Sequence, residues 1–148
     1  MYQFNEYLSF EAGADLERGD IVKLNSDNEV EKVAAAEATN AVGICYNNAD
    51  EGDKVTVLVR GVMDDVHLLV EDTDSSSGYD DPIAHGDLLV ISGKASGTYV
   101  AGQALSTTAG SGVSTADATT IIGRSLTAVA GVDSGDTYTT GKVFVNFV

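Results

Sequence analysis

The feature that most constrains the fold is a Gly-Asp turn that recurs before short apolar strands. Gly19-Asp20 precedes Ile21 to Leu24, and Gly86-Asp87 precedes Leu88 to Ile91. Glycine and aspartate are typical turn residues, whereas β-branched residues favour strands. The chain contains 18 Val and 6 Ile but only 10 Leu. This combination predicts an all-β protein with short strands joined by tight turns.

Alternation with a period of two residues locates the individual strands. It is clearest from Lys54 to Arg60, and it recurs from Lys142 to Val148. Further strands are expected over Ile21 to Leu24, Val30 to Val33, Ala41 to Tyr46, Val62 to Val70, Asp87 to Ile91, Thr98 to Val100 and Thr120 to Leu126. The alanine-rich run from Val33 to Ala38 is too short for a stable isolated helix, so we interpret it as a connection.

These strand signals occur twice in the same order. Three matches carry the repeat: Gly19-Asp20 with Gly86-Asp87, Ala41-Val42-Gly43-Ile44 with Ile121-Ile122-Gly123-Arg124, and Gly52 to Val57 with Gly141 to Val145. Their offsets are 67, 80 and about 88 residues, so the second half carries insertions, chiefly in the stretch from Gly93 to Thr119. Repeated order predicts two degenerate β units. The alternative is coincidence, because Gly-Asp before a strand is common turn chemistry.

We expect the two units to form a small β-sandwich or a partly closed β-barrel, since alternating strands serve both. At 148 residues the chain is long enough to fold without disulfides or metals. Four segments are predicted: an N-terminal arm or first strand over 1–14, a first β unit over 15–70, an acidic loop over 71–82, and a second β unit over 83–148.

The net charge of −15 excludes two classes of partner. A strongly negative protein repels nucleic-acid phosphates and anionic lipid surfaces, so we expect neither nucleic acid nor a membrane as partner. No apolar stretch reaches the length of a membrane span, and the start of the sequence lacks the features of a secretion signal. Synthesis in a reducing cytoplasm is the simplest expectation.

The sequence holds few residues suited to catalysis. Cys45 lies in an apolar strand, where we expect a small buried side chain, and neither His67 nor His85 lies in a cluster of metal-ligand types. No nucleophile elbow or phosphate-binding glycine loop occurs. We therefore predict no enzyme activity, no catalytic residues and no cofactor.

One weak cation site is conceivable in the acidic loop, from Asp72, Asp74, Asp80 and Asp81. Alternating oxygen ligands precede a glycine there, as in a calcium loop. However, Gly78 stands at the seventh position of that loop where the pattern has it at the sixth, and Ile83 replaces the bidentate glutamate. A plain acidic loop is the alternative interpretation. We predict that the protein binds no metal, and these four aspartates are only a weak candidate.

Aromatic residues cluster at the start of the chain. Four of the ten, Tyr2, Phe4, Tyr7 and Phe10, fall within the first ten positions, and Leu8 adds a fifth large apolar side chain. Such a segment can add as a strand to a neighbouring chain and bury its rings there. It can equally be the first strand of the protein's own sheet. These five residues are the candidate contacts to a partner or to another subunit.

The order of these motifs resembles the capsid cement, or head decoration, proteins of tailed double-stranded DNA viruses. The likeness runs over roughly residues 12 to 148 and includes Gly19-Asp20-Ile21-Val22-Lys23-Leu24, Glu51-Gly52-Asp53-Lys54-Val55-Thr56-Val57, Ala101-Gly102-Gln103-Ala104-Leu105 and Ile122-Gly123-Arg124-Ser125-Leu126. These are turn-and-strand patterns, and no single residue is diagnostic. The long acidic insertion from Glu71 to Asp81 departs from simpler members.

The resemblance implies a non-enzymatic virion protein that binds the exterior of an icosahedral capsid. Its expected partners are the major capsid protein and other copies of itself, as a homotrimer, and it would be made in the host cytoplasm. The aromatic segment from Tyr2 to Phe10 is then the expected contact. The alternative class is a carbohydrate- or receptor-binding β module on a virion or cell surface, which needs exposed aromatic platforms. An enzyme or accessory domain is the third reading, and it requires a pocket with convergent polar groups.

Overall fold

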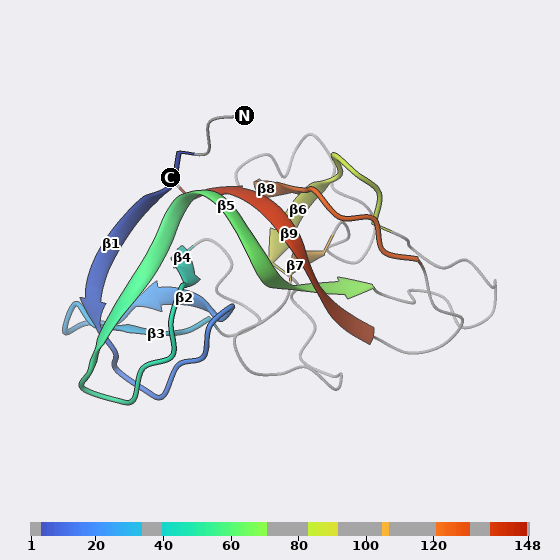
Figure 1. The fold of residues 1–148 in the computed structure, drawn as a ribbon. Helices are drawn as coiled ribbons and strands as arrows, with labels where there is room; N and C mark the ends of the chain where they lie inside the picture. Colours follow the sequence, from blue (N-terminus) through green and yellow to red (C-terminus); the bar gives the residue numbers. More distant parts are fainter. Residues whose placement is uncertain are drawn as a thin grey trace.

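The computed structural model describes residues 4–33, 40–70, 83–91, 105–106, 121–130 and 137–147. They form nine strands and no α-helix, which confirms the all-β prediction (Figure 1). The strands are β1 (Glu6–Glu11), β2 (Ile21–Leu24), β3 (Val30–Lys32), β4 (Ala41–Cys45), β5 (Lys54–Val70), β6 (Leu88–Ile91), β7 (Leu105–Ser106), β8 (Ile121–Ser125) and β9 (Thr137–Asn146). No helix in the described ranges has the length and apolar character needed to cross a membrane.

Most strands match their expected bounds to within one residue at each end, and two differ by more. The strands expected over Lys54 to Arg60 and Val62 to Val70 are one continuous strand, β5, which passes through Gly61 at a φ of 134°. β9 begins at Thr137, five residues before the expected start at Lys142, because it also pairs with the end of β5. The strand expected over Thr98 to Val100, the alanine run from 34 to 38 and the acidic loop lie outside the described residues.

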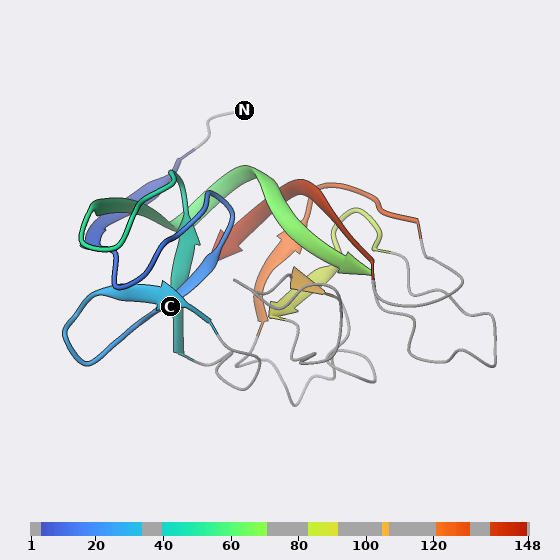
Figure 2. The same cartoon turned by 90° about the horizontal axis from the view of Figure 1, so that it is seen from below.

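The strand pairings form two rings that share β5. The first ring runs β1-β5-β4-β2-β3, and a parallel bridge between Ala12 and Val30 closes it. The second runs β5-β9-β8-β6-β7, and the parallel pair of Leu68 with Leu105 returns it to β5. Figures 1 and 2 show β5, in green, beside β1 in its first half and beside β9 in its second. These closures decide between the two expected architectures in favour of partly closed barrels.

The same hydrogen bonds recur in both rings, as two related β units require. The first unit is the first ring, and the second unit is the second ring with the second half of β5, so the division falls inside β5 and not at residue 70. Gly19 N–H donates to the Cys45 carbonyl at 2.9 Å, and Gly86 N–H donates to the Ser125 carbonyl at 2.7 Å. The register between β2 and β4 shifts after Val22, and that between β6 and β8 shifts after the equivalent Leu89. Shared bonds and a shared register shift are stronger evidence of repetition than turn composition.

The turns before β2 and before β6 explain why Gly-Asp recurs. Gly19 and Gly86 have φ angles of 98° and 87°, a conformation that favours glycine. The Asp20 carboxylate accepts a hydrogen bond from Glu17 N–H at 2.8 Å. The Asp87 carboxylate accepts the equivalent bond from the residue three positions earlier at 2.7 Å. The glycine therefore allows the turn, and the aspartate side chain closes it.

The third offset of the repeat is two residues shorter than the sequence indicated. Val57 pairs with Cys45, and Val143 pairs with the equivalent Ser125, so the offset between the two valines is 86 residues. A shift of two residues keeps each side chain on its own face of the strand. The sequence alignment therefore placed the correct faces together with the wrong partners.

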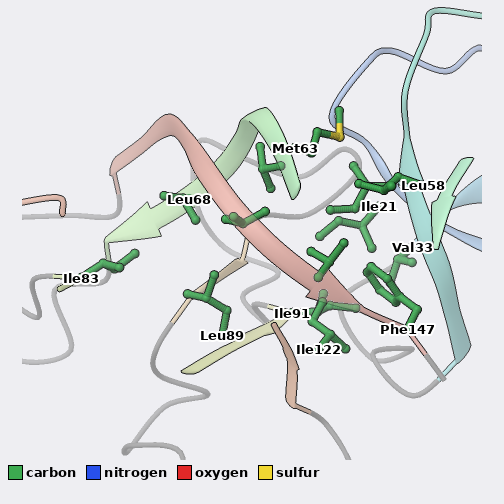
Figure 3. Close-up of a cluster of buried hydrophobic side chains, with 14 residues drawn as sticks. Ile21, Val33, Leu58, Met63, Leu68, Ile83, Leu89, Ile91, Ile122 and Phe147 are labelled. Atoms are coloured by element: carbon green, nitrogen blue, oxygen red, sulfur yellow. The ribbon is translucent and has the colours of Figure 1, made fainter. Parts of the chain in front are cut away.

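Two buried clusters stabilise the molecule. The smaller lies inside the first ring and consists of Ala12, Leu16, Val22, Val30, Cys45, Ala49, Val55 and Val57. The larger draws on both units, and Figure 3 shows its side chains between the strands. It includes Ile21, Ile44 and Leu58, which alternate with residues of the small cluster and so point away from it. The outer side of the first ring is thus buried with residues of the second unit.

Candidate contact surface

The expected contact segment forms the first strand of the protein's own sheet. β1 pairs antiparallel with β5, with Leu8 opposite Val57 and Phe10 opposite Val55. β5 is the only strand partner of β1 in the described part of the chain. Of the two alternatives drawn from the sequence, the first-strand arrangement therefore holds for residues 6–11. Tyr2 lies outside the described residues.

Large apolar side chains remain exposed along this strand. The exposed fractions are 84% for Phe4, 53% for Leu8 and 40% for Tyr7. Phe10 differs, because it packs against the small buried cluster. Burying a side chain of this size in a contact contributes about 1.5–3 kcal/mol. Phe4 and Leu8 thus provide apolar area that a partner can cover, whereas Phe10 mainly stabilises the first ring.

Tyr7 belongs to a second arrangement, a network of rings and polar groups that the sequence did not indicate. Its ring meets that of Tyr46 edge-on, with centroids 5.0 Å apart. The Arg18 guanidinium lies 4.5 Å from the Tyr46 centroid and donates to the Tyr46 carbonyl at 2.6 Å. The Asn5 amide donates to the Tyr7 hydroxyl at 2.8 Å. These side chains, with Asp64, line an open pocket of about 510 Å³.

The sequence carried no local signal for this pocket. Tyr7, Arg18 and Tyr46 come from separate turns and strands. The hydrogen bond from Gly19 N–H to the Cys45 carbonyl holds Arg18 beside Tyr46, and the pairing of β1 with β5 adds Tyr7. Because Arg18 covers a face of the Tyr46 ring, that ring offers less stacking area than an open aromatic platform. The pocket presents hydrogen-bonding groups more than apolar surface.

The titratable residues considered for catalysis occupy structural positions. Cys45 is fully buried as expected, and burial, reinforced by the nearby Asp20 carboxylate, raises its pKa to about 12. Its thiol therefore stays protonated, and a protonated thiol is a poor nucleophile. Burial lowers the pKa of His67, although the Asp20 and Glu17 carboxylates oppose the shift. His85 is exposed, and its Nδ1 lies 3.1 Å from the Leu126 carbonyl oxygen.

Asp20 is a buried charged residue of the first unit. It is 2% exposed, and its carboxylate lies 3.3 Å from the Lys32 ammonium. In the described part of the chain no group of three metal-ligating residues occurs. The four candidate cation ligands, Asp72, Asp74, Asp80 and Asp81, lie outside the described residues.

A further exposed surface lies on the second unit, which we call the outer face of the second unit: Leu88, Arg124 and Phe144. Arg124 lies between the other two in the sheet, since Leu88 on β6 and Phe144 on β9 both pair with it. Phe144 is 37% exposed, and a shallow pocket of about 200 Å³ opens between these residues and Ile121. The match of Ile44 with Arg124 in the sequence repeat was a signal for this difference between the units.

No protein-family model matches the chain. No curated protein matches its sequence either. The class that the coordinates define is a two-unit β protein with exposed apolar side chains at its first strand and on the outer face of its second unit.

Proposed function

We propose that the chain is a non-enzymatic structural protein of a virus particle that binds the outside of an icosahedral capsid and stabilises it. In this role its partners are the major capsid protein and further copies of itself, as a homotrimer. It is made in the host cytoplasm and resides on the capsid exterior. The observation that carries the proposal is the exposed apolar segment at β1, where Phe4 and Leu8 are 84% and 53% exposed.

Two further properties support this role. The repeat and strand order that resemble capsid decoration proteins coincide with two hydrogen-bonded β units. The charge of −15 suits an exterior coat, because it repels packaged nucleic acid and keeps free chains apart in solution. A compact β scaffold of this kind holds an apolar contact segment in a defined place, which lowers the entropic cost of binding.

Copy number in particles tests the proposal directly. Quantitative mass spectrometry of purified particles from the source culture measures this chain against the major shell protein. A fixed ratio near one to one, or a simple fraction such as one third, supports a lattice-wide decoration protein. Absence of the chain from particles overturns the proposal.

The contact itself is tested with point substitutions. Deletion of residues 1–10 would remove most of β1 and expose Val55 and Val57, so it would confound binding with folding. Leu8→Ser and Phe4→Ser change exposed side chains and keep the strand. We expect each substitution to weaken binding to particles from which the chain has been removed by about tenfold, the equivalent of about 1.4 kcal/mol. Unchanged binding by the double variant would remove β1 from the contact.

The pocket beside Tyr7 favours a second candidate function, a carbohydrate- or receptor-binding module. It has two rings, an arginine and a carboxylate around an open space of about 510 Å³. A glycan array with the intact chain and an Arg18→Ala variant tests this reading. Specific glycan binding that Arg18→Ala alters would favour the binding module, and a flat array would leave the capsid role as the better account.

A further inference from the structure

Equivalent positions on the outer faces of the two β units differ in burial. The pairings make Ile21 equivalent to Leu88, Ile44 to Arg124 and Leu58 to Phe144. The three residues of the first unit are fully buried. On the second unit Leu88 is half-buried, Arg124 is exposed and Phe144 is 37% exposed.

The outer face of the first unit is buried by residues of the second unit. Ile21, Ile44 and Leu58 share one buried cluster with Met63, which is 2% exposed and lies in the second half of β5. Figure 3 shows Met63 on the same side of the cluster as Ile21 and Leu58. Within the molecule, a side chain of the second half of β5 thus packs on the outer face of the first unit.

The counterpart of Met63 in the first unit is Leu8. Met63 pairs with Val143 as Leu8 pairs with the equivalent Val57. Yet Leu8 is 53% exposed. Both kinds of surface that meet in this internal contact therefore also occur exposed on the molecule. One is the strand end with Leu8 and the neighbouring Phe4, and the other is the outer face of the second unit.

We propose that these surfaces bind each other between copies of the chain, head to tail. The outer face of the second unit, with Leu88, Arg124 and Phe144, takes the β1 end of a second copy, with Leu8 at its centre. The pocket of about 200 Å³ on this face has room for one aliphatic side chain. Charge also matches, because the face presents Arg124 and the β1 end presents Glu6, which is exposed.

Contacts of this type are heterologous, so each copy uses two different surfaces. This distinguishes the proposal from a symmetric dimer, in which one surface meets itself. It deepens the homotrimer of the proposed function, and it is tested on the free chain because Leu8 cannot contact a second copy and a capsid at the same time. A failure to self-associate therefore leaves particle binding open, and a failure to bind particles leaves self-association open.

The test uses two variants that each break one surface. Phe144→Asp alters the outer face of the second unit, and Leu8→Asp alters the β1 end. Sedimentation velocity is measured over a dilution series at physiological and higher salt, since a charge of −15 opposes association at low ionic strength. We expect the unaltered chain to exceed its monomer mass of 15.3 kDa and each variant alone to remain monomeric.

Mixing is the decisive step. A one-to-one mixture of Phe144→Asp and Leu8→Asp retains one intact pair of surfaces, so we expect it to form a dimer of twice the monomer mass. Leu24→Asp is the matched control, because Leu24 is an exposed leucine, at 41%, on neither surface, and it should associate like the unaltered chain. Circular dichroism confirms folding, and Leu8→Ser and Phe144→Ser replace any variant that fails it.

Three results would overturn the proposal. One is a monomer for the unaltered chain at every concentration. Another is a mixture that stays monomeric while each variant alone also does, because that pattern belongs to a symmetric contact. Equal loss of association in the Leu24→Asp control would likewise assign the effect to added charge and not to the two surfaces.

Discussion

In the first β unit the outer residues Ile21, Ile44 and Leu58 are buried, whereas their equivalents in the second unit reach the surface. Both units nevertheless share their turns, register shift and backbone hydrogen bonds. The common features are local, since they follow from turn residues and strand alternation. The different ones depend on what each face meets. A comparison of matched substitutions can therefore separate the two kinds of determinant.

The largest difference is expected from exchanging the charged and apolar residues at one equivalent pair. Ile44→Arg places an unpaired charge in the large cluster and should cost about 3–5 kcal/mol of unfolding free energy. Arg124→Ile changes an exposed position and should shift it by about 0.5 kcal/mol. Urea unfolding of both variants measures the contrast. Similar losses in the two would mean that the faces do not differ in burial.

Truncation at the next equivalent pair should give a smaller contrast. Leu58→Ala removes a fully buried side chain and leaves a cavity, so we expect a loss of about 3 kcal/mol. Phe144→Ala removes a ring that is 37% exposed, and less than about 1 kcal/mol should be lost in the isolated chain. Thermal unfolding at low protein concentration separates them, and a larger effect at Phe144 would contradict the assignment.

The two turn aspartates provide a third, finer comparison. Asp20→Ala removes the acceptor for Glu17 N–H and the partner of Lys32, and we expect a loss of about 2 kcal/mol. Asp87→Ala removes the equivalent acceptor at a more exposed site, with a loss of about 1 kcal/mol. Chemical denaturation at neutral pH measures both. Equal losses would show that burial of Asp20 adds nothing to the turn.

The smallest effect is a dependence of stability on pH at His67. Burial lowers the pKa of its imidazole in the folded state below the ordinary 6.5, so the unfolded chain binds the proton more readily. Stability should fall as the pH drops below about 6.5, and the loss should continue down to the lowered folded pKa. His67→Gln should reduce this slope. The same pH slope in both proteins would assign the effect to carboxylates.

Much of the fold followed from sequence reasoning, and the reasons are local. Gly19-Asp20 and Gly86-Asp87 mark turns because positive φ favours glycine and a carboxylate can close the turn. Strand positions such as Ile21–Leu24 follow from alternation. The fusion of two expected strands into β5 did not follow, because Gly61 indicates a break in sequence but here permits a close approach to Asn5.

The candidate contact was predicted in part. Clustering of aromatic residues identified the segment that contains Phe4 and Leu8, and the structure separates these exposed side chains from Phe10, which packs inward. The network of Tyr7, Arg18 and Tyr46 escaped prediction, since its members are far apart in the chain and meet only through long-range pairing of turns and strands.

The sequence by itself determined the strand class, the turns and the repetition of a β unit, because each depends on residues close together in the chain. The exchange of Ile44 for Arg124 is the one signal in the sequence that the two outer faces differ, and the tertiary structure decided the burial of the other positions. Leu58 and Phe144 are both large apolar residues at equivalent strand positions, and nothing local distinguishes them. Among the described residues the second unit packs on the outer face of the first, and no equivalent unit packs on the outer face of the second, so one face is buried and the other is exposed.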